Sequence, residues 1–330
     1  MKKTLKDAIK SQFVKSEDIK GVKVEGYDFD KGIDFREMLD KYKSSGSQAH
    51  MLSKAIDIIR KMRKERVSIF LGYTSNMVTS GNRDIIRYLV KHKLVHVLVT
   101  TTGGIEEDFM KTIKPFIMGD FRADGADLRR RGINRAGNIF IPNDRYVEFE
   151  KFLQPVLEHF MKKQRETGEI TVPSEIVDYM GSRMKDKSSI YYWAHKNNIP
   201  VFCPAFMDGA VGDNVYFFNY QKDNDLKIDM ARDNHNLIEL AMKAEETGLI
   251  ILGAGVVKHM ICNVNIMRDG AKYAVYVNTE PEYNGSDSGA LPEEAKSWGK
   301  LTPNANAVKV FGDLTIILPL IVAGAFVDEK

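Results

Sequence analysis

The sequence predicts an α/β fold: a Rossmann-like, doubly wound and mostly parallel sheet of six or more strands, with helices on both faces and extra helices. Two observations support this prediction. Short apolar runs that are typical of buried strands alternate with segments of helical periodicity, as in parallel sheets covered on both faces. Each apolar run is also followed at once by small, hydroxylated or acidic residues, as in turns that lead from a strand into a helix.

Six apolar runs are predicted to be strands: residues 67–71, 95–99, 200–203, 249–252, 273–277 and 308–311. Apolar side chains at helical spacing predict helices over residues 48–64, 83–91 and 236–247, the last ended by Gly248, and several helices over residues 144–196. Residues 116–138 are rich in Gly, Asp and Arg, and we expect an irregular segment of the functional or mobile kind. Residues 314–327 are the most apolar run. Pro319 interrupts this run and it is too short to span a bilayer, so we expect a buried strand-to-helix element.

Length and composition are those of a globular protein. The 330 residues are 43% hydrophobic and 28% charged, which allows a sizeable core in either one large domain or two moderate ones. Residues 1–33 are polar and weakly patterned, so we expect an N-terminal arm with one short amphipathic helix and extended chain. The first residues, MKKTLKDAIKSQF, lack the apolar core of a signal peptide.

Charge, cysteine and histidine usage argue against several functional classes. The net charge of +3 is small, and the basic runs at residues 61–66 and 129–131 lack interleaved aromatics, so we interpret them as solvated surface rather than a nucleic-acid site. Cys203 and Cys262 cannot form a disulfide framework, which fits a reducing, cytoplasmic setting. The seven histidines form no HExxH or comparable cluster, so no metal site is predicted.

The residues that follow the predicted strands suit a nucleotide. Ligands of open α/β sheets bind outside the carboxyl ends of the strands, so the six turns are predicted to form one composite site. Gly253-Ala254-Gly255 begin like a dinucleotide-binding fingerprint, although Lys258 stands where the third glycine would be. Thr101-Thr102-Gly103-Gly104 suit backbone N–H contacts with phosphate at a helix start. The full set of turns is residues 72–76, 100–104, 204–208 with Asp213, 253–255, 278–280 and 312–313.

Residues 283–300 combine carboxylates, an indole and a terminal lysine in one short segment, which we expect to lie opposite these turns. Carboxylates and the face of Trp298 suit a multiply charged amine, and Lys300 suits imine formation with a carbonyl or imine substrate. The same segment also suits an ordinary connector, because a Glu pair after Pro292 is typical of a first helical turn and Gly299 of a helix end. From the residues alone, both interpretations stay open.

Other polar residues admit two interpretations in the same way. The acidic run 106–108 opens a predicted helix, where the helix dipole stabilises carboxylates; alternatively, one of them meets an ammonium group. Asp208 and Asp213 suit either a turn or a bound cation. His259 is either a structural residue of a first helical turn or a proton acceptor at the sheet edge.

Seven motifs follow one another along most of the chain: GYTSNMVTSG (72–81), TTGGIEED (101–108), GINRAGN (132–138), DGAVGD (208–213), GAGVVKH (253–259), YAVYVNT (273–279) and NGSDSGALPEEAKSWGK (284–300). In this order they resemble the deoxyhypusine synthase family. The resemblance implies an NAD-dependent transferase, with residues 34–330 as a single NAD-binding catalytic domain. Members of the family pass a hydride from spermidine to NAD, release 1,3-diaminopropane and carry the aminobutyl group as an imine on an enzyme lysine. The group is then transferred to a lysine of the hypusine-containing translation initiation factor, and the hydride is returned.

The resemblance also implies roles for individual residues. It implies that Lys300 is the covalent nucleophile and that His259 is a base near the polyamine. The residues implied for spermidine binding are Glu106, Glu107, Asp213, Ala254, Gly285, Ser286, Asp287, Glu294 and Trp298. The residues implied for NAD binding are Ser75, Asn76, Met77, Val78, Thr79, Thr101, Thr102, Gly103, Glu107, Asp208, Thr279, Asp313 and Leu314. Enzymes of the family are homotetramers with active sites at a dimer interface, so the resemblance further implies that neighbouring subunits share these residues.

Three positions depart from the family's pattern. Ala254 stands where a glycine is common, Met260 where a second histidine is common and Leu291 where an arginine is common. None of them removes a catalytic group, but all lie in or near the implied polyamine site and bear on the choice of acceptor. The alternative function is that of homospermidine synthases, which resemble this family and use putrescine as acceptor. A non-catalytic NAD or polyamine sensor on the same scaffold is the alternative from another class.

Overall fold

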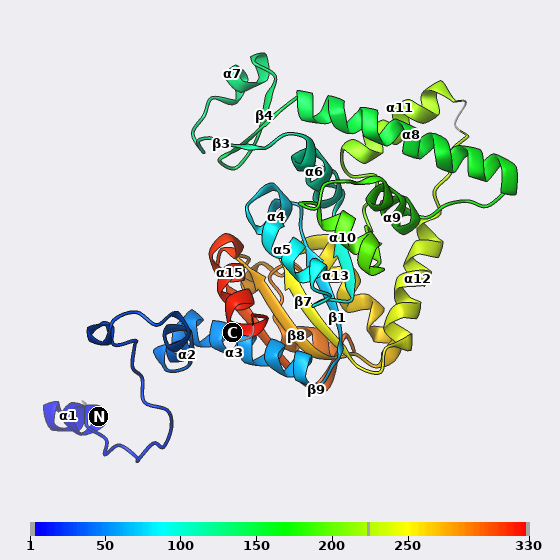
Figure 1. The fold of residues 1–330 in the computed structure, drawn as a ribbon. Coiled ribbons are helices and arrows are strands. Elements are labelled where there is room, and N and C mark those ends of the chain that lie inside the picture. The colour runs from blue at the N-terminus through cyan, green and yellow to red at the C-terminus, as the bar shows by residue number, and fades with distance from the viewer. Residues whose placement is uncertain (1–3, 223–224, 328–330) are drawn as a thin grey trace.

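A six-stranded, fully parallel sheet forms the centre of the protein in a computed structural model that describes residues 4–222 and 225–327 (Figure 1). Across the sheet the order is β6-β2-β1-β7-β8-β9, so the strand order reverses between β1 and β7, as in doubly wound dinucleotide-binding folds. The predicted fold class and all six predicted strands are confirmed. The strands are β1 (Ser68–Tyr73), β2 (Val97–Thr100), β6 (Val201–Phe202), β7 (Thr247–Leu252), β8 (Ala271–Asn278) and β9 (Leu301–Phe311).

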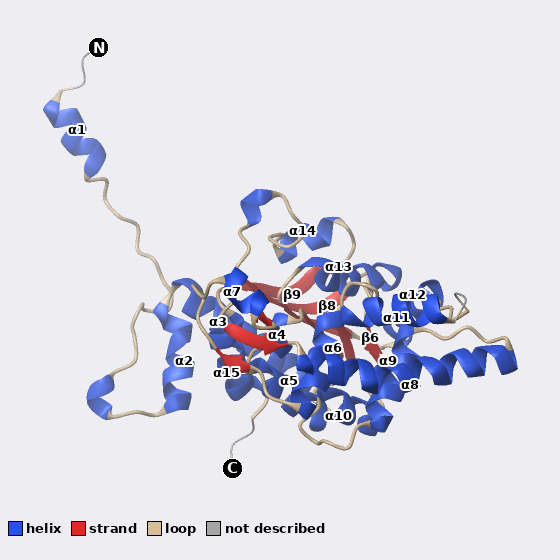
Figure 2. Ribbon diagram, turned by 90° about the horizontal axis from the view of Figure 1, so that it is seen from above, coloured by secondary structure: helices blue, strands red, loops and turns tan. Residues whose placement is uncertain are grey.

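Helices cover both faces because the strands bury side chains on both. In β1, Ile69 and Leu71 belong to the core beneath one helical layer, and Phe70 belongs to the core beneath the other. The first layer contains α3 (Ser47–Lys64), α5 (Asn82–Lys91), α6 (Thr102–Ile113) and α15 (Leu314–Ala325), and the short α4 (Asn76–Thr79) leads into it. The second contains α12 (Met230–Lys243), α13 (Gly255–Val264) and α14 (Pro292–Ser297). Figure 2 shows α13 and α14 on one side of the strands and α3, α5 and α15 on the other.

A long excursion of the chain separates β2 from β6. It contains β3 (Ile117–Met118), α7 (Gly125–Arg130), β4 (Ile133–Ala136), β5 (Ile139–Pro142), α8 (Asp144–Thr167), α9 (Pro173–Arg183) and α10 (Ile190–Asn197), and α11 (Ala210–Gln221) follows β6. The predicted helices over residues 144–196 are therefore confirmed. The prediction of an irregular segment over residues 116–138 is wrong, since β3, β5 and β4 form a small antiparallel sheet. Its strands have two to four residues each, too short to display the alternation of a strand.

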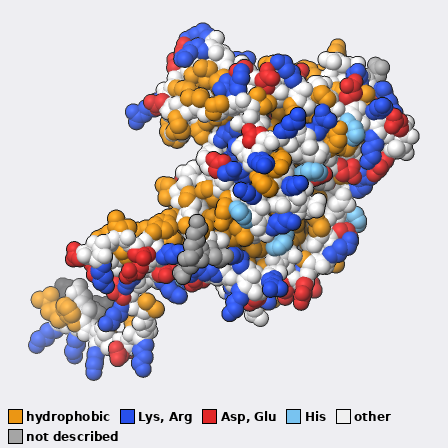
Figure 3. All heavy atoms as spheres, in the orientation of Figure 1, with side chains coloured by type: hydrophobic (Ala, Val, Ile, Leu, Met, Phe, Trp, Pro, Cys, Tyr) orange, Lys and Arg blue, Asp and Glu red, His pale blue; other side chains and the backbone are white. Residues whose placement is uncertain are grey.

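The small antiparallel sheet stands away from the large one and carries exposed apolar side chains. Figure 3 shows hydrophobic surface around it, above the body of the molecule. Met118 and Phe121 are exposed there, at 72% and 67%. Gly137, with φ of +59°, forms the turn between β4 and β5.

Two predicted helix boundaries differ from the structure. The helix predicted over residues 236–247 begins earlier, at Met230, where the Asp229 side chain accepts from the Arg232 N–H, and it ends at Lys243. Gly248 does not end it, because Thr247 and Gly248 pair with β1 as the first residues of β7. The apolar run that begins at Leu314 contains no strand in the described residues; α15 runs through Pro319 instead.

The N-terminal residues extend away from the body in both ribbon views (Figures 1 and 2). α1 (Leu5–Gln12) begins with a capping box between Thr4 and Asp7 and buries none of its side chains. The short turn η1 (Phe29–Lys31) and α2 (Phe35–Ser45) follow. No helix within the described ranges is long and apolar enough to cross a membrane. No three His, Cys, Asp or Glu residues of residues 4–222 and 225–327 are grouped so as to hold a metal ion.

Candidate active site

The segment that ends at Lys300 is fixed by a helix C-terminal motif. Gly299, two residues beyond α14, has a φ of +70°, a left-handed conformation that glycine adopts without strain. The Gly299 N–H donates to Lys296 O and the Lys300 N–H donates to Ala295 O, both at 3.0 Å, which is the pattern of a Schellman motif. Because β9 begins at the next residue, the backbone of Lys300 is held from both sides.

The side chain of Lys300 lies in a small pocket between α13 and α14. It is buried, with 7% exposure, and its Nζ lies 3.8 Å from Asp287 Oδ1 and 5.9 Å from the centre of the Trp298 ring. The other carboxylate oxygen, Asp287 Oδ2, is buried and has no hydrogen-bond partner among the described residues. Burying such an oxygen without a partner is costly, so it marks a position where an ammonium group of a ligand would bind.

His259 shares the same carboxylate. Its Nδ1 lies 3.6 Å from Asp287 Oδ1, and its Nε2 accepts from Asn263 Nδ2 at 2.6 Å, one turn further along α13. With Nε2 accepting, the proton of the neutral ring is on Nδ1, on the side of Asp287. Asp287 therefore lies between His259 Nδ1 and Lys300 Nζ, where it can orient both groups and stabilise whichever of them carries a proton.

A second group of acidic side chains lies where α6 begins, after β2. Glu106 is buried, and its Oε2 accepts from the Val211 N–H at 3.0 Å, at the start of α11. Burial raises the pKa of Glu106 to about 7; backbone N–H groups of α11 lower it, and Asp213 and Asp208 raise it. Glu106 therefore joins α6 to the turn that carries both aspartates.

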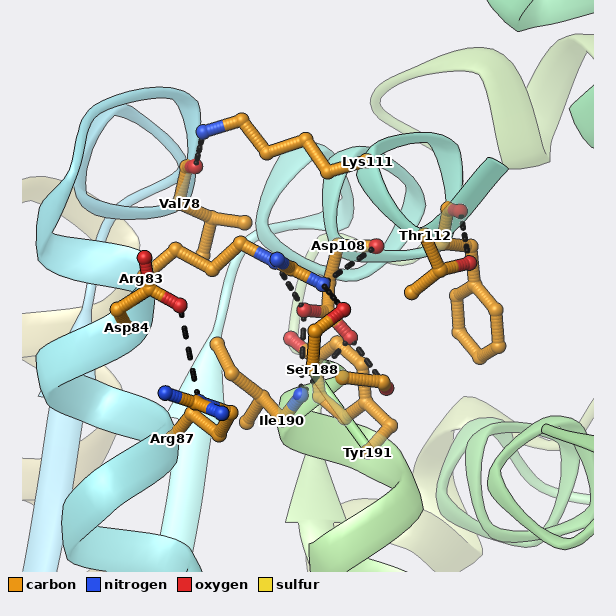
Figure 4. Close-up of polar contacts among 12 residues, drawn as sticks. Val78, Arg83, Asp84, Arg87, Asp108, Lys111, Thr112, Ser188, Ile190 and Tyr191 are labelled. Atoms are coloured by element: carbon orange, nitrogen blue, oxygen red, sulfur yellow. Dashed lines mark hydrogen bonds and ion pairs between the residues drawn. The ribbon is translucent and has the colours of Figure 1, made fainter. Parts of the chain in front are cut away.

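Glu107 is held by α4, the short helix after β1, rather than by α11. It accepts from the hydroxyl of Thr79, and burial raises its pKa to about 7 against the lowering effect of this hydrogen bond. Lys111, one turn after Glu107, donates to the carbonyl oxygens of Val78 and Thr79 at 2.6 Å and of Ser80 at 3.0 Å; Figure 4 draws its contact with Val78. Lys111 thus holds the last turn of α4 in place, and with it the hydroxyl that contacts Glu107.

The turns at the carboxyl edge approach one another closely enough to require glycine. A Cβ on Gly103 would lie 2.8 Å from Ser75 Cβ, and a Cβ on Gly253, whose φ is +101°, would lie 2.5 Å from Thr74 Oγ1. Gly255 opens α13 with a φ of +64°, and no described atom lies within 4 Å of the place of its missing side chain. These turns flank the reversal between β1 and β7, where ligands of doubly wound sheets bind, so the residues present fit a dinucleotide.

The lysine group and the acidic group lie in different helical layers. Lys300, His259 and Asp287 lie with α13 and α14, whereas Glu106 and Glu107 belong to α6 in the layer on the other face of the sheet. No hydrogen bond or ion pair within the described residues joins the two groups.

The position of Lys300 along the strands differs from our expectation. Leu301 pairs with Ala271 at the amino end of β8, seven residues and about 23 Å from Asn278 at its carboxyl end. Only the end of the lysine segment departs from our expectation. Ser288 contacts the turns after β7 and β8, through the Gly255 N–H and Asn278 Nδ2, whereas the backbone of Lys300 lies away from them. The reason is topological, since β9 is parallel to β8 and its connection must return along the whole length of the sheet.

The remaining predicted residues are distributed over the same two regions. Met77 and Val78 are buried in the apolar core, so that only their backbone can meet a ligand. Asp313 caps α15 by accepting from the Thr315 N–H at 2.7 Å. On the side of α13 and α14 lie Ala254, Gly285, Ser286, Glu294 and Trp298. At the carboxyl ends of the strands lie Ser75, Asn76, Thr79, Thr101, Thr102, Asp208, Asp213, Thr279, Asp313 and Leu314.

Comparison with known proteins identifies the family. The family model for deoxyhypusine synthase matches residues 37–325. This chain belongs to the deoxyhypusine synthase family. A Methanocaldococcus jannaschii member is 48% identical over 321 residues, which cover 93% of this chain and 97% of the relative. Deoxyhypusine synthase of Arabidopsis thaliana is 43% identical over 347 residues, covering 96% and 93%.

A solved structure agrees with this assignment. The crystal structure of an Entamoeba histolytica deoxyhypusine synthase homologue is 31% identical, covers 92% of this chain and 96% of its own, and superposes with a TM-score of 0.67. The chain is thus a transferase of the deoxyhypusine synthase type, and the resemblance found in its motifs is confirmed.

Some residues around the deoxyhypusine synthase site were missed by the sequence prediction. Asn263 and Lys111 lie four residues after His259 and Glu107 in predicted helical segments. Residues four apart in a helix are neighbours, so this spacing could have placed both beside the predicted site residues. Lys309 gave no such signal, because its contacts lie 20 and 29 residues away in the chain.

Proposed function

We propose that this protein, in a cytoplasmic setting, transfers the aminobutyl group of spermidine through an imine on Lys300 to a lysine of the hypusine-containing translation initiation factor. NAD is the proposed cofactor, and 1,3-diaminopropane is the released product. The observation that carries the proposal is the buried Lys300 amine, 3.8 Å from Asp287 and 5.9 Å from the ring of Trp298. A polyamine in this pocket meets a carboxylate with an unpartnered oxygen and an indole face, both of which attract cations.

The nucleophile in this proposal is the free amine of Lys300. After the polyamine is oxidised at the carbon beside its secondary nitrogen, Lys300 Nζ attacks that carbon and the bond to the secondary nitrogen breaks. The proton that Lys300 loses passes to the departing nitrogen, so 1,3-diaminopropane leaves as an amine and the aminobutyl group remains on Lys300 as an imine. Asp287 orients the amine, and His259 carries that proton between the two nitrogens on Nε2, the ring nitrogen without hydrogen in its neutral form.

In the second half of the reaction, the aminobutyl group passes from Lys300 to the acceptor. Its lysine amine attacks the imine carbon, Lys300 leaves as the free amine, and reduction of the new imine completes the product. NAD supplies the hydride chemistry when it is bound, as acceptor in the first half and donor in the second. The residues that would hold NAD lie in the turns after β1 and β2 and in those after β6, β8 and β9, which carry Asp208, Thr279 and Asp313. In the first two turns, Gly103 allows the start of α6 to approach Ser75.

We further propose that a complete site is assembled from two subunits of a homotetramer. The placement of Lys300 and Glu107 in helical layers on opposite faces of the sheet supports this, because no hydrogen bond or ion pair of the described residues joins the two groups within one chain. Mixing a Lys300→Ala variant with a Glu107→Gln variant under conditions that exchange subunits tests it. We expect each variant to be inactive alone and the mixture to regain activity; a mixture that stays inactive although its subunits have exchanged contradicts the shared site.

Trapping with borohydride tests the proposed function directly. The protein is incubated with spermidine and NAD, quenched with borohydride, digested and mapped by mass spectrometry. We expect a reduced aminobutyl adduct on Lys300, none in Lys300→Arg, and an unchanged adduct in Lys296→Arg, a matched substitution on α14. A wild-type protein without an aminobutyl mass on Lys300 overturns the proposal.

A competition between acceptors tests the second half of the reaction. The translation factor precursor and putrescine are offered together after the adduct has formed. We expect the aminobutyl group on the factor, and transfer to putrescine alone would contradict the proposed acceptor. Release of 1,3-diaminopropane in the same assay separates an enzyme from a ligand sensor.

A further inference from the structure

We propose that Lys258 and Lys309 are positioning residues, two buried ammonium groups that clamp the loop of residues 280–290 and hold Asp287 between Lys300 and His259. The inference rests on the proposed function, because the site is the same one. Neither lysine belongs to the residues assigned above to substrate or cofactor.

Lys309 closes the two ends of the loop. It lies in β9 with 9% exposure, and its Nζ donates to Glu280 O at 2.5 Å and to Gly289 O at 2.6 Å. These carbonyls lie near the first and last residues of the loop, so one ammonium group joins both ends. Charged donors form the stronger hydrogen bonds to carbonyl oxygens, and burial strengthens them further.

Lys258 holds the residue that carries the carboxylate. It lies in α13 with 3% exposure, and its Nζ donates to the carbonyl of Asp287 itself and to Ala290 O at 2.9 Å. The ring of Tyr276 lies beneath the same ammonium group, 5.0 Å away. Lys258 therefore fixes the backbone of Asp287 directly, while the Asp287 side chain stays free to reach Lys300 and His259.

Further contacts hold the loop, among them the Ser286 N–H that donates to Asn284 Oδ1 and the Gly289 N–H that donates to Ser286 O, but neither joins the loop to another element as the two lysines do. A Cβ on Gly289 would lie 2.0 Å from Pro281 O, so the ends of the loop touch, and only a residue without a side chain fits there. Asn278 Nδ2 donates to Ser288 O at 3.3 Å, and the Gly255 N–H donates to Ser288 Oγ at 3.2 Å. Both buried amines donate to carbonyl groups of the loop, which leaves them unsuited as nucleophiles and suited as clamps.

Two variants test the clamp: Lys258→Met and Lys309→Met, which keep the length of the side chain and remove the charge. Lys272→Met is the matched control, because Lys272 lies on β8 and pairs with Glu65 in a partly exposed ion pair. Two quantities are measured in each protein: amide hydrogen exchange of residues 280–290, and the rate of the borohydride-trapped adduct on Lys300. We expect faster exchange confined to the loop and a loss of about 10²-fold in the adduct rate for both lysine variants, with the control unchanged.

The outcomes are distinguishable. Loop exchange as slow as in the wild type overturns the clamp, and faster exchange with an unchanged adduct rate overturns the positioning role. A wild-type protein that forms no adduct overturns the proposed function instead, while the exchange measurement still reports on the clamp. If a lysine variant does not fold, Gly289→Ala displaces the same loop without removing a charge, and an undiminished adduct rate in that variant contradicts the inference.

Discussion

Lys300 Nζ lies 3.8 Å from Asp287 Oδ1, close enough for electrostatic attraction but beyond the length of a hydrogen bond. The carboxylate therefore orients the amine without binding it tightly. Its second oxygen stays available to a ligand, since Oδ2 is buried and unpartnered in the described structure.

Replacing Asp287 with Asn is expected to lower the rate of adduct formation on Lys300 by about 10²-fold or more. The amide has the shape of the carboxylate but no negative charge, so it orients neither the lysine nor a substrate ammonium group. Single-turnover trapping with borohydride measures the rate. Glu293→Gln is the control, because it makes the same chemical change at an exposed position of α14. Equal losses in the two variants would contradict a specific role for Asp287.

Replacing Gly103 with Ala is expected to weaken NAD binding by about tenfold or more, which corresponds to about 1.4 kcal/mol. The added methyl group would lie 2.8 Å from Ser75 Cβ and would push apart the turn after β1 and the start of α6. Isothermal titration calorimetry with NAD measures the affinity. Gly125→Ala in α7, where a Cβ has nothing within 4 Å among the described atoms, is expected to bind NAD as the wild type does.

Replacing Glu107 with Gln is expected to stabilise the ligand-free protein at pH 8 by about 1–2 kcal/mol. Burial raises the pKa of Glu107 in the folded protein to about 7, above the usual value of 4.5. The folded state therefore binds a proton more tightly than the unfolded state, and the stability contributed by Glu107 falls as pH rises from about 4.5 to 7.

Denaturant unfolding of both proteins at pH 5 and pH 8 measures this effect. We expect the gain of Glu107→Gln at pH 8 to be several times smaller at pH 5, where Glu107 is protonated in the folded wild type and only the unfolded chain has begun to lose its proton. A gain of the same size at both pH values would show that the charge of Glu107 is not its origin.

Replacing Asp108 with Asn is expected to destabilise the protein by about 3–5 kcal/mol, because it leaves a buried guanidinium without its partner. Arg83 Nε donates to Asp108 Oδ1 at 2.6 Å, and Asp108 also accepts from Ser189 Oγ at 2.6 Å and from the Ile190 N–H at 3.1 Å. The pair thus joins α5, α6 and the start of α10 in the cluster drawn in Figure 4.

A neighbouring ion pair in the same view provides the control for this variant. Asp84 lies 3.6 Å from Arg87 Nε, with its side chain 64% exposed. We expect Asp84→Asn to change the free energy of unfolding by no more than about 0.5 kcal/mol, because exposed pairs contribute little. Similar losses in thermal or denaturant unfolding of the two variants would contradict the difference in burial as the cause.

Long apolar runs and helical periodicity allowed most of the fold to be predicted, because they record burial directly. The strand at residues 249–252 and the helix at residues 83–91 are both present within a few residues. The antiparallel sheet of β3, β5 and β4 was not predicted, because its short strands are defined by pairing and by the Gly137 turn rather than by periodicity. The end of α12 was misplaced for a related reason, since pairing with β1 takes Thr247 and Gly248 into β7.

The fold class and the family follow from the amino-acid sequence, which also marks Lys300 and the strand-end turns as the residues to test. How these residues are arranged depends on the packing of the chain, which buries Lys300 beside Asp287 and His259 and places Glu106 and Glu107 on the other face of the sheet. The same packing also brings Lys309 to the loop that carries Asp287. The physical reason is that burial and periodicity are local properties of a sequence, whereas the direction of a side chain depends on contacts between segments far apart in the chain.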